Sequence, residues 1–91
     1  MIGKILFSKR FVKHYQKAPA KVQAQFKTKI ALFEQNQHDV RLRNHPLAGN
    51  WLGCRSIDIT GDWRAVYEEL KNGQSMWAEF VEIGTHSQLY K

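Results

Sequence analysis

The pattern of apolar and polar positions predicts a strand and two helices in the first 36 residues. Residues 2–7 favour a short strand, and Ser8 can cap a helix that runs to about Lys17. Pro19 suits the first turn of a second helix, which Asn36 is expected to end. Apolar residues recur in this second helix at the spacing of a buried stripe, at Val22, Phe26, Ile30 and Phe33. We interpret that stripe as core and nothing more.

The rest of the chain has the pattern of an antiparallel sheet. Residues 54–59, 62–71 and 74–83 are expected to form three strands, joined by turns at Thr60-Gly61 and Asn72-Gly73. Residues 37–53 form an irregular loop, and a loop of this length in a compact domain is often functional. The whole chain, 1–91, is therefore predicted to be a single α+β domain, a small sandwich in which two helices cover one face of a three-stranded meander.

Two-residue loops at both turns would assign each strand residue to a face, because directly paired residues share a face. The helix-covered face is expected to hold Cys54, Trp63, Ala65, Tyr67, Met76, Ala78 and Phe80, with Asp58 opposite Trp63. The open face is expected to hold Arg55, Asp62, Arg64 and Glu79, among Ile57, Val66, Val81 and Ile83. Asp62 then pairs with Ile83 and Arg64 with Val81, which brings His86 close to Asp62. A slip of one residue at Thr60-Gly61 would move Arg55 to the other face.

Composition narrows the class of partner. The 91 residues carry a net charge of +6, which favours a polyanion or an acidic protein, although many small domains are basic for no specific reason. The single cysteine, Cys54, forbids an internal disulfide and suits a reducing cytosol. No apolar stretch approaches the ~18 residues of a membrane span, and no signal peptide is recognisable. We expect a cytoplasmic protein without a membrane partner.

Two histidines and an arginine are the main candidates for chemistry. His45 in the long loop and His86 after the last strand can act as general base and acid, or can simply be surface histidines. Arg64, helped by Arg55, matches a phosphate, or forms an ion pair with a neighbouring carboxylate. Asp62 can orient a histidine, or can be an ordinary turn aspartate. The histidine spacing and lone cysteine match no recognised metal site, so no metal or other cofactor is expected.

Two aromatic residues also have alternative interpretations. Trp63 is expected to pack in the core or sheet rather than to stack on a base. Tyr90, near the end of the chain, can donate to a phosphate, stack on a base or clamp the C-terminal tail.

Four short segments and the C-terminal pair Leu89-Tyr90 form a recognisable pattern. The segments run from His45 to Trp51, from Gly53 to Ile57, from Asp62 to Tyr67 and from Gly84 to Ser87. Their order and spacing resemble the RelE/ParE toxin superfamily, most closely its YafQ-type branch of bacterial mRNA interferases. The resemblance implies a ribosome-dependent endoribonuclease that cuts mRNA in the A site. It also implies a cognate acidic antitoxin protein, through which operator DNA is bound only indirectly.

The resemblance also assigns roles to individual residues. His45, Asp62, Trp63 and His86 match active-site positions of the branch, Tyr90 matches an aromatic near the C-terminus, and Arg64 matches the phosphate-binding arginine of RelE-type members. One position departs, because the branch usually has a histidine where this chain has Asp58. We expect His45 to take the 2′-hydroxyl proton and His86 to protonate the leaving 5′ oxygen. The alternatives are a ParE-type gyrase inhibitor without nuclease activity and a catalytically weak nucleic-acid-binding member.

Overall fold

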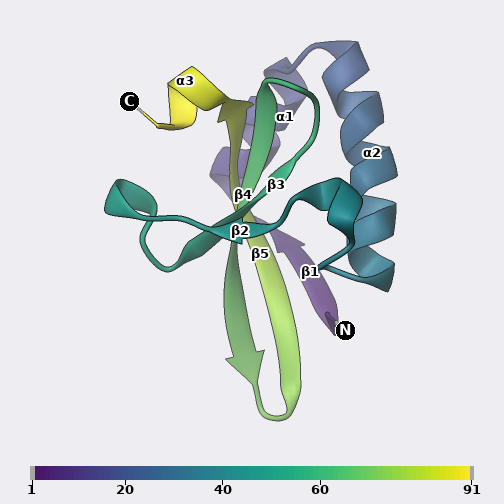
Figure 1. Ribbon diagram of the computed structural model, residues 1–91, viewed down its shortest axis with the longest axis vertical. Helices are drawn as coiled ribbons and strands as arrows, with labels where there is room; N and C mark the ends of the chain where they lie inside the picture. The colour runs from purple at the N-terminus through teal and green to yellow at the C-terminus, as the bar shows by residue number, and fades with distance from the viewer. Residues whose placement is uncertain (1, 91) are drawn as a thin grey trace.

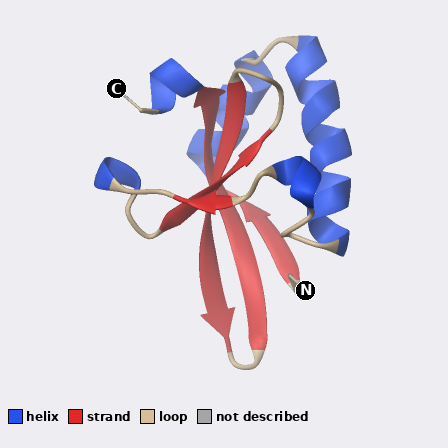
Figure 2. Ribbon diagram, in the orientation of Figure 1, coloured by secondary structure: helices blue, strands red, loops and turns tan. Residues whose placement is uncertain are grey.

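The computed structural model describes residues 2–90. The larger elements are β1 (Lys4–Phe7), α1 (Lys9–Lys17), α2 (Ala20–Gln35), β3 (Cys54–Asp58), β4 (Trp63–Asn72) and β5 (Ser75–Thr85). The smaller ones are the 3₁₀ helices η1 (Val40–Leu42) and η2 (Gly49–Trp51), the strand β2 (His45–Pro46) and the helix α3 (His86–Leu89). The strands form one sheet in the order β1-β5-β4-β3-β2, with β1 parallel to β5 and the other pairs antiparallel (Figures 1 and 2).

Helices α1 and α2 cover one face of this sheet, as the α+β prediction required (Figure 1). The fully buried Phe80 of β5 lies at the centre of the core, where its ring is 5.3 to 5.9 Å from five other aromatic rings. The expected stripe of α2 supplies Val22, Phe26 and Phe33 to the same core. Ser8 caps α1 as predicted, because its Oγ accepts a hydrogen bond from the Phe11 amide at 3.0 Å. Among residues 2–90, no helix is long and apolar enough to span a membrane.

The β4–β5 hairpin has a different register from the one expected. Asn72 pairs with Ser75, so the two-residue loop is Gly73-Gln74, with Gly73 at a φ of +64° that favours glycine. A β-bulge between Val66 and Tyr67 shifts the register once more. Arg64 therefore lies opposite Gly84 instead of Val81, and the predicted pairing of Asp62 with Ile83 is wrong. Ile83 belongs to the core rather than to the open face.

The β3–β4 connection produces the one-residue slip. Four residues, 59–62, separate the two strands, so Thr60-Gly61 is not a two-residue loop. Asp58 consequently pairs with Arg64, and the expectation that it faces the helices opposite Trp63 is wrong. Arg55 pairs with Tyr67 and Ile57 with Ala65, so both move to the helix-covered face, while Cys54 leaves it. The slip brings the Asp58 carboxylate next to the Arg64 guanidinium.

Four short elements were not expected from the sequence. The loop predicted at 37–53 contains η1, the two-residue strand β2 and η2, and β2 pairs with β3 through His45 and Ser56. The single-turn helix α3 follows β5 directly. Its N-terminus has a capping box, in which Thr85 Oγ1 accepts from the Gln88 amide and Gln88 Oε1 accepts from the Thr85 amide. These elements hold the two candidate histidines.

Candidate active site

Most of the residues predicted to form the site line one open cavity of about 580 Å³. We call it the histidine cavity, and it is lined by Arg43, Asn44, His45, Asp58, Arg64, His86 and Tyr90. These side chains come from β2 and the segment before it, from β3, from β4 and from α3 with the residue that follows it. The cavity therefore brings together five of the eight predicted site residues, namely His45, Asp58, Arg64, His86 and Tyr90.

His45 is exposed, and its ring is held by the backbone. Its Nδ1 lies 2.8 Å from the Arg43 carbonyl oxygen, which can only accept a hydrogen bond. In the neutral ring the proton is therefore on Nδ1, and Nε2 carries the free lone pair. That tautomer is the one a general base at Nε2 requires.

A polar network fixes the segment that carries His45. The side-chain amide of Asn44 donates at 2.7 Å to the hydroxyl of the buried Tyr67 and at 2.8 Å to the Gln37 carbonyl. Its Oδ1 accepts from Arg55 Nε at 2.7 Å. The guanidinium expected to help bind phosphate is thus engaged with Asn44, and Arg55 does not line the histidine cavity. Arg55 instead contacts Asn44, the residue next to His45.

Arg64 is held rigidly by both the strand and the turn before it. Its Nε is 3.0 Å from Asp58 Oδ1, and both side chains are only 17% exposed. Its Nη1 donates to the carbonyl oxygens of Thr60, Gly61 and Trp63 at 3.0 to 3.2 Å. The opposite Asp58 oxygen lies 3.6 Å from Arg43 Nε. The second terminal nitrogen of Arg64, Nη2, has no hydrogen-bond partner among residues 2–90, and Arg64 lines the cavity.

Helix α3 positions the other imidazole. The His86 amide donates to the Asp62 carbonyl oxygen at 2.9 Å, which confirms the predicted closeness of these residues, although the contact is between backbones. The His86 ring meets Tyr90 edge to face at 4.7 Å between centroids, and the Tyr90 hydroxyl donates to Ser56 Oγ at 3.2 Å. Trp51 Nε1 donates to the Leu89 carbonyl oxygen at 2.8 Å and thereby fastens the end of α3 to the long loop.

Two further predicted residues, in addition to Arg55, lie apart from the histidine cavity. Asp62 is exposed in the β3–β4 connection and contacts His86 through its backbone only. Trp63 lines a separate cavity, which lies on the other side of α3. Two lining residues, Arg43 and Asn44, were not predicted. Their only signal was their place beside His45 in a loop rich in arginine and asparagine.

The free thiol of Cys54 is an unsuitable nucleophile. Burial, with a smaller contribution from the Glu68 carboxylate, raises the pKa of Cys54. Within residues 2–90, no group of three His, Cys, Asp or Glu side chains is placed to hold a metal ion. The functional groups that line the histidine cavity include two imidazoles, a fixed guanidinium and a phenol.

This basic chain has the α+β fold of RelE/YafQ-type toxins. Two histidines and an anchored arginine lie at one end of its sheet. A family model described as the bacterial toxin of type II toxin–antitoxin systems, YafQ, matches residues 3–91. The chain belongs to this family of toxins. A search of curated proteins gave no significant match.

Solved structures agree with the family assignment. A histidine-to-glutamine mutant of YafQ from E. coli is 27% identical, with a TM-score of 0.73 over 96% of this chain and 97% of that one. YafQ in its complex with DinJ from E. coli is also 27% identical, with a TM-score of 0.67 and the same coverage. YoeB in a YoeB–YefM complex from Staphylococcus aureus, at 19% identity, shares the fold with a TM-score of 0.69 over 94% of this chain and 98% of that one.

Proposed function

We propose that this toxin is a ribosome-dependent endoribonuclease that cuts mRNA through acid–base chemistry of its own side chains. The observation that carries the proposal is the histidine cavity, in which His45, His86 and the anchored Arg64 line one open space. Two imidazoles near one phosphate can move both protons of an internal transesterification, and a guanidinium can stabilise its charge. A module that only binds another protein has no need of this set.

The proposed reaction starts at the ribose 2′-hydroxyl. Nε2 of His45 takes the hydroxyl proton while the 2′ oxygen attacks the adjacent phosphorus. The bond from phosphorus to the 5′ oxygen breaks, and His86 gives that oxygen a proton. The products are a 2′,3′-cyclic phosphate and a free 5′-hydroxyl. The hydrogen bond from His45 Nδ1 to the Arg43 carbonyl supports the direction, because it leaves Nε2 free to accept.

Arg64 supplies the electrostatic part of the proposal. Since Asp58 and three carbonyl oxygens hold its Nε and Nη1, the guanidinium is oriented before RNA arrives, with Nη2 left for a phosphate oxygen. A pre-placed donor of this kind contributes about 10²–10³-fold to a rate. Asp62 positions His86 through its backbone, Tyr90 contacts the substrate beside His86, and Arg55 supports the His45 segment through Asn44. The ribosome would add to catalysis by positioning the mRNA.

The second part of the proposal is an acidic antitoxin partner. YafQ from E. coli and YoeB from Staphylococcus aureus are each found in complex with a second protein, DinJ or YefM. The net charge of +6 suits an acidic segment that folds as it binds, and it also suits ribosomal RNA. We place the toxin in the bacterial cytoplasm, where both partners are found.

Primer extension after induced expression in a bacterial host tests the nuclease proposal. We expect the wild-type chain to produce codon-phased cuts in translated mRNA. His45→Ala and His86→Ala should each lower cleavage by about 10²–10⁴-fold, because each removes one proton-transfer group. The matched control is His38→Ala, which changes an exposed histidine outside the cavity and should leave cleavage intact.

Two results would contradict the proposal. Growth arrest without new RNA ends would exclude the nuclease and direct the search to a gyrase-type target. Growth arrest that persists in the double variant His45→Ala, His86→Ala would show that these imidazoles do not carry the toxicity.

A further inference from the structure

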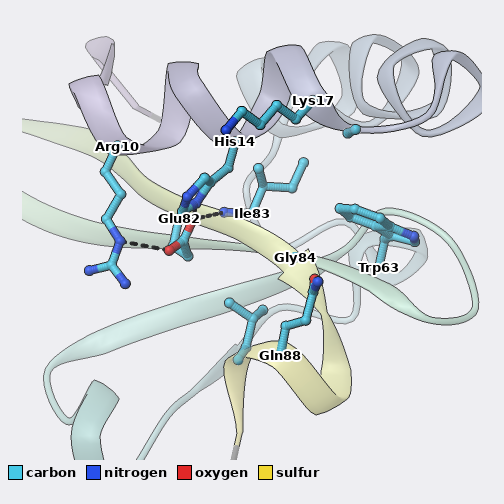
Figure 3. A pocket seen from close by; sticks show the side chains of 10 residues that line it. Arg10, His14, Lys17, Trp63, Glu82, Ile83, Gly84 and Gln88 are labelled. Atoms are coloured by element: carbon cyan, nitrogen blue, oxygen red, sulfur yellow. Dashed lines mark hydrogen bonds and ion pairs between the residues drawn. The ribbon is translucent and has the colours of Figure 1, made fainter.

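A second cavity, of about 380 Å³, lies between α1 and the open end of the β4–β5 hairpin, where β4 begins and β5 ends (Figure 3). We call it the α1–α3 cavity, and it is lined by Arg10, His14, Lys17, Ala18, Trp63, Glu82, Ile83, Gly84, Gln88 and Leu89. Helix α3 separates it from the histidine cavity. His86 and the adjoining Tyr90 line the histidine cavity, whereas Gln88 and Leu89 line this one. A ligand here would therefore touch the helix that positions His86.

A buried carboxylate organises the α1 side of this cavity. The side chain of Glu82, near the C-terminal end of β5, is only 6% exposed although it is a carboxylate. Its Oε2 accepts from Arg10 Nε at 2.7 Å, and its Oε1 lies 2.5 Å from His14 Nδ1 and accepts from the Ile83 amide at 3.0 Å (Figure 3). A buried charge persists only when it is paired and hydrogen-bonded. Glu82 therefore holds two exposed α1 side chains in fixed positions.

These fixed side chains leave cationic donors at the mouth of the cavity. Arg10 is 65% exposed and binds Glu82 through Nε. Its two terminal nitrogens have no partner among residues 2–90 and are available for an anion. Positions 10, 14 and 17 follow one face of α1, which places Lys17 on the same side. Arg10 and Lys17 carry two positive charges, and Glu82 is the one carboxylate that they and His14 face. The rim of the cavity therefore keeps a positive charge after Glu82 is paired.

The opposite wall is aromatic and carries an amide. The half-buried indole of Trp63 lies across the cavity from α1 (Figure 3). Stacking on an aromatic ring tolerates any base, because every base has a π-face, and proteins that bind single strands use it widely. Gln88 uses its Oε1 in the capping box, and its Nε2 donates to no residue among 2–90. That nitrogen is free to meet a carbonyl oxygen of a base.

We propose that the α1–α3 cavity binds one nucleotide of an RNA strand, with the base against Trp63 and the phosphate on Arg10 and Lys17. Glu82 and His14 act as positioning residues, since they hold Arg10 rather than the ligand. The inference deepens the proposed nuclease function: the bound nucleotide belongs to the strand that is cut on the other side of α3. It also gives Trp63 a substrate contact that the histidine cavity does not offer.

Amide and indole resonances of the purified full-length chain, titrated with adenosine 5′-monophosphate, test the site directly. The His45→Ala variant serves as the parent, because His45 lies outside this cavity. We expect the Trp63 indole resonance to shift with the nucleotide and much less with adenosine or inorganic phosphate alone. Arg10→Gln with Lys17→Gln should weaken binding about tenfold or more, because charge-assisted hydrogen bonds are lost.

The matched control is Lys9→Gln with Lys13→Gln. It removes the same charge from the same helix, at exposed positions outside the cavity, and should change the affinity by less than about twofold. Lys17→Gln alone leaves the Glu82 pairs untouched and should still weaken binding. Equal losses in the two double variants, or a nucleotide shift no larger than that of phosphate, would overturn the inference.

The outcome is separable from that of the nuclease proposal. Codon-phased cleavage in cells together with no nucleotide binding at Trp63 would remove this site and leave the nuclease standing. Specific binding without any cleavage would leave the nucleotide site standing and remove the interferase function.

Discussion

At the scale of single residues, Asp58 has a clear structural role, although it stands where the toxin resemblance implies a histidine. It anchors Arg64 through Nε at 3.0 Å and lies near Arg43 at 3.6 Å. Asp58→Asn keeps the shape but removes the charge, so Arg64 should lose its fixed orientation. We expect the single-turnover cleavage rate to fall about tenfold or more, because small displacements of a positioned group cost as much as 10²-fold.

The control for this change is Glu68→Gln, which neutralises an exposed carboxylate on the same sheet. It should leave the rate unchanged. Unaltered cleavage by Asp58→Asn, with a normal melting temperature, would show that Arg64 needs no anchor.

At the scale of elements, the single-turn helix α3 depends on contacts from outside itself, because a helix of four residues is too short to be stable alone. Trp51→Phe removes the 2.8 Å hydrogen bond to the Leu89 carbonyl oxygen while keeping an aromatic ring. We expect faster amide hydrogen exchange in α3 and a several-fold lower cleavage rate. Global stability should fall by only about 0.5–1.5 kcal/mol, the usual value of one hydrogen bond.

Trp77→Phe provides the comparison for this experiment. Trp77 is half-buried on β5 and pairs with Lys4 at the far edge of the sheet. Its replacement should leave α3 exchange and cleavage as they are. If both variants loosen α3 equally, the Trp51 hydrogen bond is not what holds it.

The same scale explains which elements the sequence could predict. The long helix α2 and the strands β3 to β5 have periodic apolar patterns, and these were identified nearly to their ends. The strand register could not be predicted in the same way. It depends on the four-residue β3–β4 connection and on the bulge between Val66 and Tyr67, and the apolar pattern of the sequence indicates neither feature. Elements as short as β2 and α3 contain too few residues for any period to be visible.

The candidate site followed a similar division. Residue type and position were enough to select His45, Arg64 and His86 as candidates, and the structure places all three around one cavity. The partners of these residues depend on the register, so the Asp58–Arg64 pair and the engagement of Arg55 with Asn44 became visible only in three dimensions.

At the scale of the whole molecule, the polar network under the His45 segment connects the site to the core and therefore to stability. Tyr67 is fully buried against Phe33 and Phe80, and its hydroxyl accepts from Asn44 at 2.7 Å. Burial raises the pKa of Tyr67 above its ordinary value of 10.0, even though the Asn44 hydrogen bond acts in the opposite direction. The folded chain therefore keeps this proton at a pH where the unfolded chain releases it.

The sign of the pH dependence follows from linkage. Below the ordinary tyrosine pKa both states are protonated, and the contribution of Tyr67 to stability is complete. As the pH rises through that value toward the raised pKa, the unfolded state gains by ionising and stability is lost. We expect the melting temperature to fall steeply above about pH 10.

At neutral pH, Tyr67→Phe should lower the free energy of unfolding by about 1 kcal/mol, because the hydrogen bond from Asn44 is lost. In alkali, the stability of this variant should decline less than that of the wild type. Tyr15→Phe, at a half-buried position whose pKa is also raised by burial, should reduce the slope less. Equal alkaline slopes for Tyr67→Phe and the wild type would show that another group controls unfolding in alkali.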